Sequence, residues 1–270
     1  MKEIFFHVGL GKTASTYLQN KVFNKLKGLE YIHPTRYKKA FKIIDGSNAE
    51  KILLSREMDR QLEREVKKFS LKYPDTKAIM VLRSNDSWIA SQYRRFLKNG
   101  YPYTFTQYFD IENDKGYWKI SDALFFPKIM ILEKYFTQKP LILFYEDMRK
   151  DTFSFIDRIT KYTGTTYSKD EISLEPHHTS YEEKQLKIML KVAPGIFTKD
   201  PQYKGSAFNI WLRRRSRMLL CYIILYAALL VPKRFVSKTP LIPKEELEKV
   251  KQYFKEDWEK CIRYAEENRL

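Results

Sequence analysis

A lysine and three hydroxyl side chains follow a short apolar run at the start of the chain. Residues Glu3 to Val8 (E-I-F-F-H-V) are typical of a buried strand, and a helix is expected from Ala14, because Leu18, Val22 and Leu26 are spaced four apart. Backbone N–H groups at the start of a helix bind anions such as phosphate or sulfate. The sequence therefore predicts an oxyanion site in the connecting loop, formed by Gly11, Lys12, Thr13, Ala14, Ser15, Thr16 and Tyr17.

This loop is shorter than the one that binds nucleoside triphosphates. The pattern G-x-x-x-x-G-K-[ST] would place its first glycine at position 6, where the chain has Phe6. A compact loop suits a single terminal phosphate or sulfate group. An ATPase or GTPase is disfavoured, and a strand-to-helix turn with an incidental Lys-Thr stays open as the alternative.

A second candidate anion site follows the next apolar run, Lys77–Leu82, in V-L-R-S-N-D-S-W-I-A-S-Q-Y. Arg83 comes directly after this expected strand, and Ser91 follows eight residues later, about two turns into the next helix. An arginine fork and a hydroxyl can together bind a phosphate. Two separate anion sites predict a ligand that carries two phosphate-type groups.

Both motifs resemble those of the sulfotransferases. G-K-T-A-S-T-Y-L-Q resembles their 5′-phosphosulfate loop, usually P-K-T-G-T-T, and L-R-S-N-D-S-W-I-A-S-Q-Y resembles their 3′-phosphate motif. L-I-L-F-Y-E-D-M (Leu141–Met148) resembles the family's third strand, and the similarity spans roughly residues 3 to 165. The sequence most resembles the bacterial carbohydrate sulfotransferases. This resemblance implies that the donor is 3′-phosphoadenosine 5′-phosphosulfate (PAPS) and that the acceptor is a hydroxyl group of a glycan or glycolipid. It also implies a reaction that needs no metal.

The loop departs from the family pattern at three positions. Gly11 stands where the family usually has proline, Ala14 where it has glycine, and Tyr17 where some branches have tryptophan. The Ala14 methyl is tolerable in a helical backbone conformation and costly if φ is positive.

The resemblance also implies the catalytic residues. Lys12 would stabilise charge on the leaving phosphate oxygen, and Glu57 resembles the glutamate of a Ser-x-Glu segment that acts as base in many carbohydrate sulfotransferases. The alternatives are that Glu57 is a solvated charge on a helix, and that His7, just before the loop, is the base. His177 and His178 would lie near the 3′-phosphate of the donor or serve a structural role.

The elements that must position these residues indicate an α/β fold. Three apolar runs, Glu3–Val8, Lys77–Leu82 and Pro140–Tyr145, are separated by long helical stretches, which is typical of a parallel sheet. We expect a three-layer, P-loop-like fold with a central parallel sheet flanked by helices, and helices over Ser47–Leu71 and Phe153–Thr163. The predicted domains are a sulfotransferase α/β core at 1–205 and a C-terminal helical region at 206–270, with an apolar helix at 213–235 and a terminal helix at 243–268.

The apolar helix has two interpretations. Met218 to Val231 holds fourteen apolar residues without a charge, fewer than the ~20 that span a bilayer. It is either a core helix or one that faces a membrane surface. The basic residues that flank it would then meet an anionic leaflet: Arg213, Arg214, Arg215, Arg217, Lys233 and Arg234.

The composition indicates the charge of the binding partner and the cellular location of the protein. Fifty Lys and Arg against 33 Asp and Glu give a net charge of +17, which favours an anionic partner. Two cysteines predict neither a disulfide framework nor a zinc site, and no leader is visible, so the expected location is the cytoplasm, peripheral to the inner membrane face if 213–235 binds there.

Two further function classes stay open: a P-loop nucleotide kinase, and a basic nucleic-acid-binding protein, although no nucleic-acid motif is visible. The aromatic cluster Tyr101, Tyr103, Phe105, Tyr108 and Phe109 would either stack on sugar rings or form core.

Overall fold

A computed structural model describes residues 2–175, 181–199 and 201–269. The chain divides into two compact units, which are described separately. The first consists of Met1–Ser84, Leu124–His177 and Phe254–Leu270, and the second of Asn85–Ala123 and His178–Tyr253. Neither unit has a boundary at residue 205, and the split predicted there stays a prediction.

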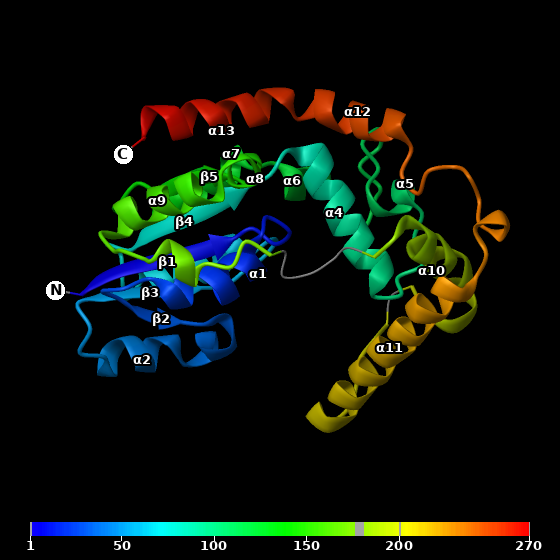
Figure 1. Cartoon of the computed structure of the whole chain (residues 1–270), viewed down its shortest axis with the longest axis horizontal. Coiled ribbons are helices and arrows are strands. Elements are labelled where there is room, and N and C mark those ends of the chain that lie inside the picture. The colour runs from blue at the N-terminus through cyan, green and yellow to red at the C-terminus, as the bar shows by residue number, and fades with distance from the viewer. Residues whose placement is uncertain (1, 176–180, 200, 270) are drawn as a thin grey trace. The chain divides into compact units, whose positions relative to one another are not determined.

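A five-stranded parallel sheet forms the centre of the first unit (Figure 1). Its strand order is β2-β3-β1-β4-β5, so β1 pairs with β3 on one side and with β4 on the other. The predicted α/β fold with a parallel sheet flanked by helices is confirmed. The strands are β1 (Glu3–Gly9), β2 (Glu30–Ile32), β3 (Lys51–Ser55), β4 (Lys77–Leu82) and β5 (Leu141–Phe144).

Helices cover both faces of this sheet because successive residues of β1 point to opposite sides. Phe5 belongs to a core cluster with Leu18 and Ile159, whereas the Phe6 ring packs on Phe69 from the other side, with ring centroids 4.9 Å apart. The helices of this unit are α1 (Ser15–Tyr17), the π-helix η1 (Leu18–Val22), η2 (Phe23–Lys25), η3 (Pro34–Lys39), α2 (Ala40–Gly46), α3 (Leu62–Ser70), α7 (Phe126–Tyr135), α8 (Tyr145–Lys150), α9 (Thr152–Thr163), η4 (Lys169–Glu171) and α13 (Lys255–Glu267).

Two strands lie where the sequence predicts none. The strands expected at the three long apolar runs are confirmed as β1, β4 and β5. The helix expected over Ser47–Leu71 is wrong, because this segment holds strand β3, a loop and then α3. Parallel pairing with β1 buries Ile52, Leu53 and Leu54, and this non-local contact outweighs the helical propensity of the residues around them.

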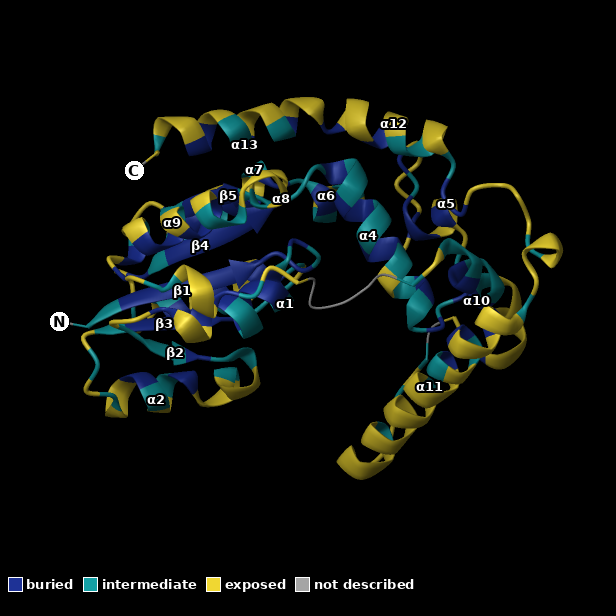
Figure 2. Ribbon diagram, in the orientation of Figure 1, coloured by how far each residue is buried: buried dark blue, intermediate teal, exposed yellow. Residues whose placement is uncertain are grey.

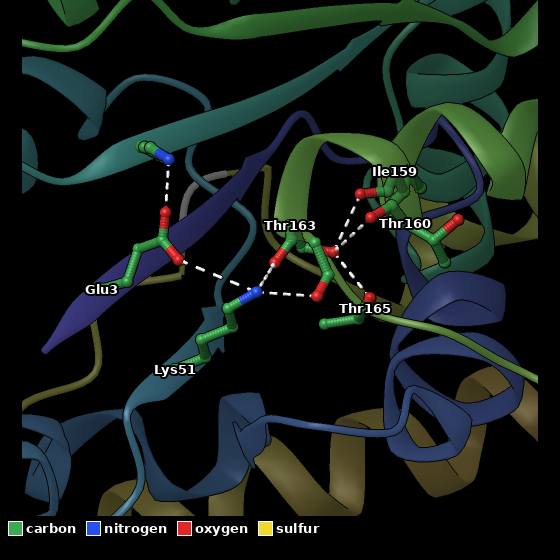
Figure 3. Close-up of polar contacts among 8 residues, drawn as sticks. Glu3, Lys51, Ile159, Thr160, Thr163 and Thr165 are labelled. Carbon is green, nitrogen blue, oxygen red and sulfur yellow. Dashed lines mark hydrogen bonds and ion pairs between the residues drawn. The ribbon is translucent and has the colours of Figure 1, made fainter.

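The C-terminal end of α9 is fastened to the amino ends of β1 and β3 (Figure 3). Lys51 Nζ donates to the carbonyl oxygens of Thr163 (3.0 Å) and Gly164 (2.7 Å) and forms an ion pair with Glu3. Gly164 has φ 59°, which confirms the predicted helix end at a left-handed glycine. This cluster lies at the end of the sheet opposite to the predicted anion loop.

The predicted terminal helix at 243–268 is two helices, α12 (Lys244–Tyr253) in the second unit and α13 in the first. In the first unit, the buried Asp257 carboxylate of α13 accepts hydrogen bonds from the backbone N–H groups of Phe125 (2.8 Å) and Phe126 (3.1 Å) at the start of α7. Burial raises the pKa of this carboxyl group. The terminal helix is thus docked through the α7 N-terminus.

The second unit is helical. Arg217 of α11 donates to the carbonyl oxygens of Asn99 (3.2 Å) and Gly100 (2.9 Å), which follow α4. No helix among the described residues has the length and apolar content to cross a membrane. The helices are α4 (Asn85–Lys98), α5 (Phe105–Tyr108), α6 (Ile120–Ala123), α10 (Glu183–Ile196), α11 (Ala207–Ala227), η5 (Ala228–Leu230), η6 (Lys233–Phe235) and α12.

Candidate functional site

The predicted anion loop lies at the carboxyl end of the central strand. β1 ends at Gly9, and the following residues lead into α1. In parallel α/β sheets, ligands bind at the carboxyl ends of the strands where the chain turns to opposite sides of the sheet. The strand order places β1 at that point, with β3 and β4 beside it.

Two of the predicted hydroxyl groups hold the loop in shape. Thr13 Oγ1 (2.7 Å) and Ser15 Oγ (2.6 Å) both donate to the carbonyl oxygen of Leu10, and both side chains are buried. Thr16 is half-buried and Tyr17 is buried in the core cluster. In this structure the protons of Thr13 and Ser15 therefore fix the backbone of the loop.

The loop backbone is left-handed at Lys12 (φ 67°) and at Ala14 (φ 66°). Alternation of left- and right-handed residues turns successive N–H groups towards one point and forms an anion-binding nest. Ala14 is also the N-cap of α1 and gives no side-chain cap to its first turn. This backbone has the form that an oxyanion site needs.

Arg83 reaches the loop from the end of β4. Its Nη1 donates to the carbonyl oxygen of Lys12 (3.3 Å), and its guanidinium lies over the Tyr145 ring, 4.6 Å from the centroid. The structure thus brings together the first predicted motif and the arginine of the second. Ser91 lies in α4, which belongs to the second unit, and its approach to Arg83 stays a prediction.

Glu57 lies in a loop after β3 and not in a helix. The N–H of Arg56 donates to the carbonyl oxygen of His7 (2.9 Å), and the N–H of Met58 donates to that of Val8 (2.9 Å). These two bonds continue the β1–β3 pairing past the end of β3. The helix in the alternative of a solvated helix charge is therefore wrong, whereas the role of the half-exposed Glu57 as base stays a prediction.

The Glu57 side chain approaches the anion loop at Gly11. A Cβ atom on Gly11 would lie 3.3 Å from Glu57 Oε2, and one on Gly9 would lie 3.2 Å from the Glu57 Cα. Gly9 also has φ 106°, a conformation that favours glycine. Two glycines therefore allow the segment that carries the predicted base to lie against the predicted anion loop.

His7 occupies a different environment. The ring is fully buried, its Nδ1 is 2.7 Å from Ser55 Oγ, and Gln19 Nε2 donates to the same hydroxyl (3.0 Å). Burial lowers its pKa to about 3. A neutral imidazole without access to solvent is poorly placed to act as the base, which favours Glu57.

Comparison with known proteins identifies the family of the chain. The model of the family described as sulfotransferase domain matches residues 1–200. The chain belongs to the sulfotransferase domain family. A sulfotransferase from Alicyclobacillus acidocaldarius has a similar fold, with a TM-score of 0.51 and 14% identity over 71% of this chain and 95% of that chain. Mouse sulfotransferase SULT7A1 complexed with PAP matches with a TM-score of 0.42 and 17% identity, over 63% of this chain and 60% of that chain. No curated protein matches the chain.

Asp59 contacts the predicted anion loop, although the sequence does not single it out. Its Oδ1 accepts a hydrogen bond from the N–H of Gly11 (3.0 Å). Proline has no N–H group, so a proline at position 11 could not make this hydrogen bond. In the sequence, Asp59 could have been recognised by its position two residues after the candidate base Glu57.

The aromatic cluster of the sulfotransferase chain is largely core. Phe105, Tyr108 and Phe109 are buried, and Tyr101 stacks on Phe96 with centroids 4.3 Å apart. Only Tyr103 and Tyr101 of the cluster are half-exposed. The core interpretation is confirmed for the three buried rings.

Two other features of the sulfotransferase chain complete the site survey. Within the described ranges, no three His, Cys, Asp or Glu side chains are placed to hold a metal ion. His177 and His178 lie outside the described residues. Cys221 and Cys261 are buried free thiols.

Replacing Ala14 with glycine is expected to stabilise the protein. An alanine in the left-handed region is strained by roughly 1–2 kcal/mol, and glycine removes this strain at some cost in the entropy of the unfolded chain. We expect the free energy of unfolding in urea to rise by about 1 kcal/mol. Ala40→Gly is the matched control, because Ala40 has φ −55°, and this variant should lose stability. A loss in both variants would contradict the prediction.

Burial of His7 should make the fold sensitive to acid. The unfolded state takes up the proton near pH 6.5, whereas the folded state does so only near pH 3, so stability falls as the pH drops through this interval. Between pH 7 and pH 5 the His7 contribution should be about 2 kcal/mol. His7→Asn should flatten the dependence of unfolding free energy on pH in this range. An equal slope in the wild type and His7→Asn would refute this assignment.

Proposed function

We propose that this sulfotransferase uses PAPS as donor and the hydroxyl of a glycan or glycolipid as acceptor. The observation that carries the proposal is the meeting of Arg83 and Glu57 at the Lys12 loop. A left-handed nest, a lysine and an arginine suit a ligand with two separate anionic groups, and a carboxylate beside them suits a reaction that needs a base. The acceptor class follows from the resemblance of the motifs to those of bacterial carbohydrate sulfotransferases.

In the proposed reaction, the loop holds the 5′-phosphosulfate. The backbone N–H groups of the loop and of the first turn of α1 would bind its oxygens, together with the Thr16 hydroxyl and Lys12. Thr13 and Ser15 would preserve the shape of the loop through Leu10. Arg83 would bind the 3′-phosphate, and the same role for Ser91 stays a prediction from its motif.

The chemical step is an in-line displacement at sulfur. The acceptor hydroxyl oxygen forms a bond to sulfur while the bond between sulfur and the bridging phosphate oxygen breaks. Glu57 would take the hydroxyl proton, and Lys12 would stabilise the negative charge on the leaving phosphate oxygen. Catalysis of this kind depends on positioning and charge stabilisation, which the loop, Lys12 and Glu57 would provide.

The first experiment is titration of the purified protein with 3′-phosphoadenosine 5′-phosphate, the product of the proposed donor, and with ATP in the presence and absence of Mg²⁺. We expect metal-independent binding of the bis-phosphate. Binding of ATP–Mg²⁺ without binding of the bis-phosphate would overturn the proposed donor and favour a nucleotide kinase.

Arg83→Ala should weaken binding at the 3′-phosphate site and leave binding at the 5′-phosphosulfate loop nearly unchanged. The variant is expected to bind the bis-phosphate at least about tenfold more weakly, because a charge-assisted hydrogen bond to phosphate contributes about 1.5–3 kcal/mol. Adenosine 5′-phosphosulfate has no 3′-phosphate, and its binding should change little. Calorimetric titration of both ligands tests this. Equal weakening of both would show that Arg83 acts on the loop through Lys12 and not on the 3′-phosphate.

A further inference from the structure

Helix α11 and the two short turns after it expose an unusual amount of apolar surface. More than half of the large apolar side chains that are exposed in the described residues lie between Phe208 and Phe235. Figure 2 shows α11 in the colour of exposed residues along most of its length. We define the apolar stripe as the exposed residues Phe208, Trp211, Leu212, Leu219, Ile223, Tyr226 and Leu230.

The stripe lies on one side of the helix. Along α11, the stripe residues Phe208, Leu212, Leu219, Ile223 and Tyr226 follow one another at intervals of four, seven, four and three, the spacing of one helical face. Trp211 and the exposed Arg215 lie on the same side of the helix. The residues that pack inside the second unit, Cys221 and Leu225, fall on a different face. Gln185 Nε2 of α10 donates to the carbonyl oxygen of Leu225 (2.8 Å) and fixes that packed face. The helix is thus apolar on two faces, and the second unit buries only one of them.

The charges within and beside the stripe have one sign. The chain from Pro201 to Lys244 contains no aspartate or glutamate. Arg213, Arg214 and Arg215 in α11, and Lys233 and Arg234 after it, are exposed. Basic and aromatic side chains are also paired here: the Arg215 guanidinium lies 5.8 Å from the Trp211 ring centroid, and that of Arg234 lies 4.9 Å from the centroid of Phe235.

We propose that this surface binds an anionic lipid bilayer, with α11 lying in the headgroup region. Apolar side chains with aromatic rings would enter the acyl boundary, and the arginines would contact anionic headgroups. A second copy of the chain is a less favourable partner for this surface. Symmetric pairing through the stripe would bring two basic segments together, and the chain from Pro201 to Lys244 has no carboxylate to neutralise them. A nucleic acid would use the basic residues and leave the apolar stripe without a partner.

Membrane binding would bring the proposed enzyme to lipid-linked acceptors, but it does not depend on sulfuryl transfer. The measurement is co-sedimentation of the full chain with vesicles of phosphatidylcholine alone and of equal parts phosphatidylcholine and phosphatidylglycerol. Neither donor nor acceptor is present, so a failure here is distinct from a failure of the proposed function. We expect partition into the anionic vesicles to be at least about a hundredfold stronger, and to weaken as salt is raised.

A charge variant tests the basic part of the surface. Replacing Arg213, Arg214 and Arg215 with glutamine should weaken binding to anionic vesicles by about a hundredfold. The control variant replaces Lys67, Lys68 and Lys161, exposed residues of the first unit, with glutamine as well, so it lowers the net charge by the same amount. It should retain binding within about twofold, because the effect is local. Equal losses in both variants would overturn the proposed site.

An apolar variant tests the stripe itself. Leu219→Gln, Ile223→Gln and Leu230→Gln together should reduce vesicle binding by at least about a hundredfold, because each side chain would otherwise leave water. The side chains are exposed, so the thermal unfolding midpoint should not fall.

The matched control for the apolar variant is Leu71→Gln, Met130→Gln and Leu174→Gln, which removes exposed apolar groups elsewhere. This control should bind vesicles like the wild type. Light scattering measures the oligomeric state of the wild type and of the apolar variant. If the wild type is a dimer that binds no vesicles and the apolar variant is a monomer, the stripe serves self-association and the proposal is overturned.

A second measurement uses the wild-type fold. Trp211 is 52% exposed, whereas Trp88 is fully buried. Bromine-labelled anionic lipids should therefore quench the fluorescence of the wild type, and Trp211→Phe should remove most of that quenching. Absence of quenching in the wild type would contradict insertion of the stripe.

Discussion

Lys12→Ala is expected to lower the rate of sulfuryl transfer by about a hundred- to a thousandfold, the usual effect of removing a group that stabilises charge in a transition state. The backbone of the loop should persist, because the contact of Arg83 is with the carbonyl oxygen of Lys12 and not with its side chain. Alanine also retains a Cβ atom, so the left-handed conformation at this position is no more strained than in the wild type.

The measurement is release of the bis-phosphate product, with an accepted glycan or with water as the acceptor. Lys12→Arg keeps the charge in a different shape and should recover part of the rate. Lys68→Ala, at an exposed position of α3, is the control for loss of a surface lysine. A wild-type rate in Lys12→Ala would remove this lysine from the proposed mechanism.

The sequence predicts the parts of this fold that depend on continuous segments. β4 is predicted over its full length, and the end of α9 is predicted at Gly164, because an apolar run and a helix-ending glycine are local signals. β2 has three residues and carries no such run. β3 lies among helix-forming charged residues and becomes a strand through its pairing with β1, which no local pattern encodes.

The same distinction applies to the site. The Lys12 loop and Arg83 are recognisable because each belongs to a contiguous motif, and the structure brings them into contact. Asp59 and Gly9 are not recognisable in this way, because their importance arises from the approach of the segment after β3 to the loop after β1. The left-handed backbone of Ala14 also requires coordinates, since the same sequence fits a helical start.

For helix α11, composition alone does not predict which faces of the helix are buried. Fourteen apolar residues in a row are consistent with a core helix and with a surface helix. The difference is which faces the rest of the unit covers. Cys221 and Leu225 are covered, whereas Leu219 and Ile223 are not.

Glu57→Gln is expected to reduce turnover by about a hundred- to ten-thousandfold, the range typical of losing a general base. Binding of the bis-phosphate should be unchanged, because the amide has nearly the shape of the carboxylate and the bonds that hold this segment run through the backbone of Arg56 and Met58. The variant therefore separates proton transfer from donor binding, which Lys12→Ala does not.

Asp59→Asn is the matched control, because Asp59 is the other carboxylate at Gly11. Asparagine can still accept the hydrogen bond from the Gly11 N–H through Oδ1, so the loop should keep its shape and turnover should change less than in Glu57→Gln. The decisive comparison is the turnover of the two variants with bis-phosphate binding unchanged in both. If Asp59→Asn loses turnover as expected for Glu57→Gln and Glu57→Gln keeps it, the base is Asp59, and the loop positions its catalytic carboxylate through Gly11.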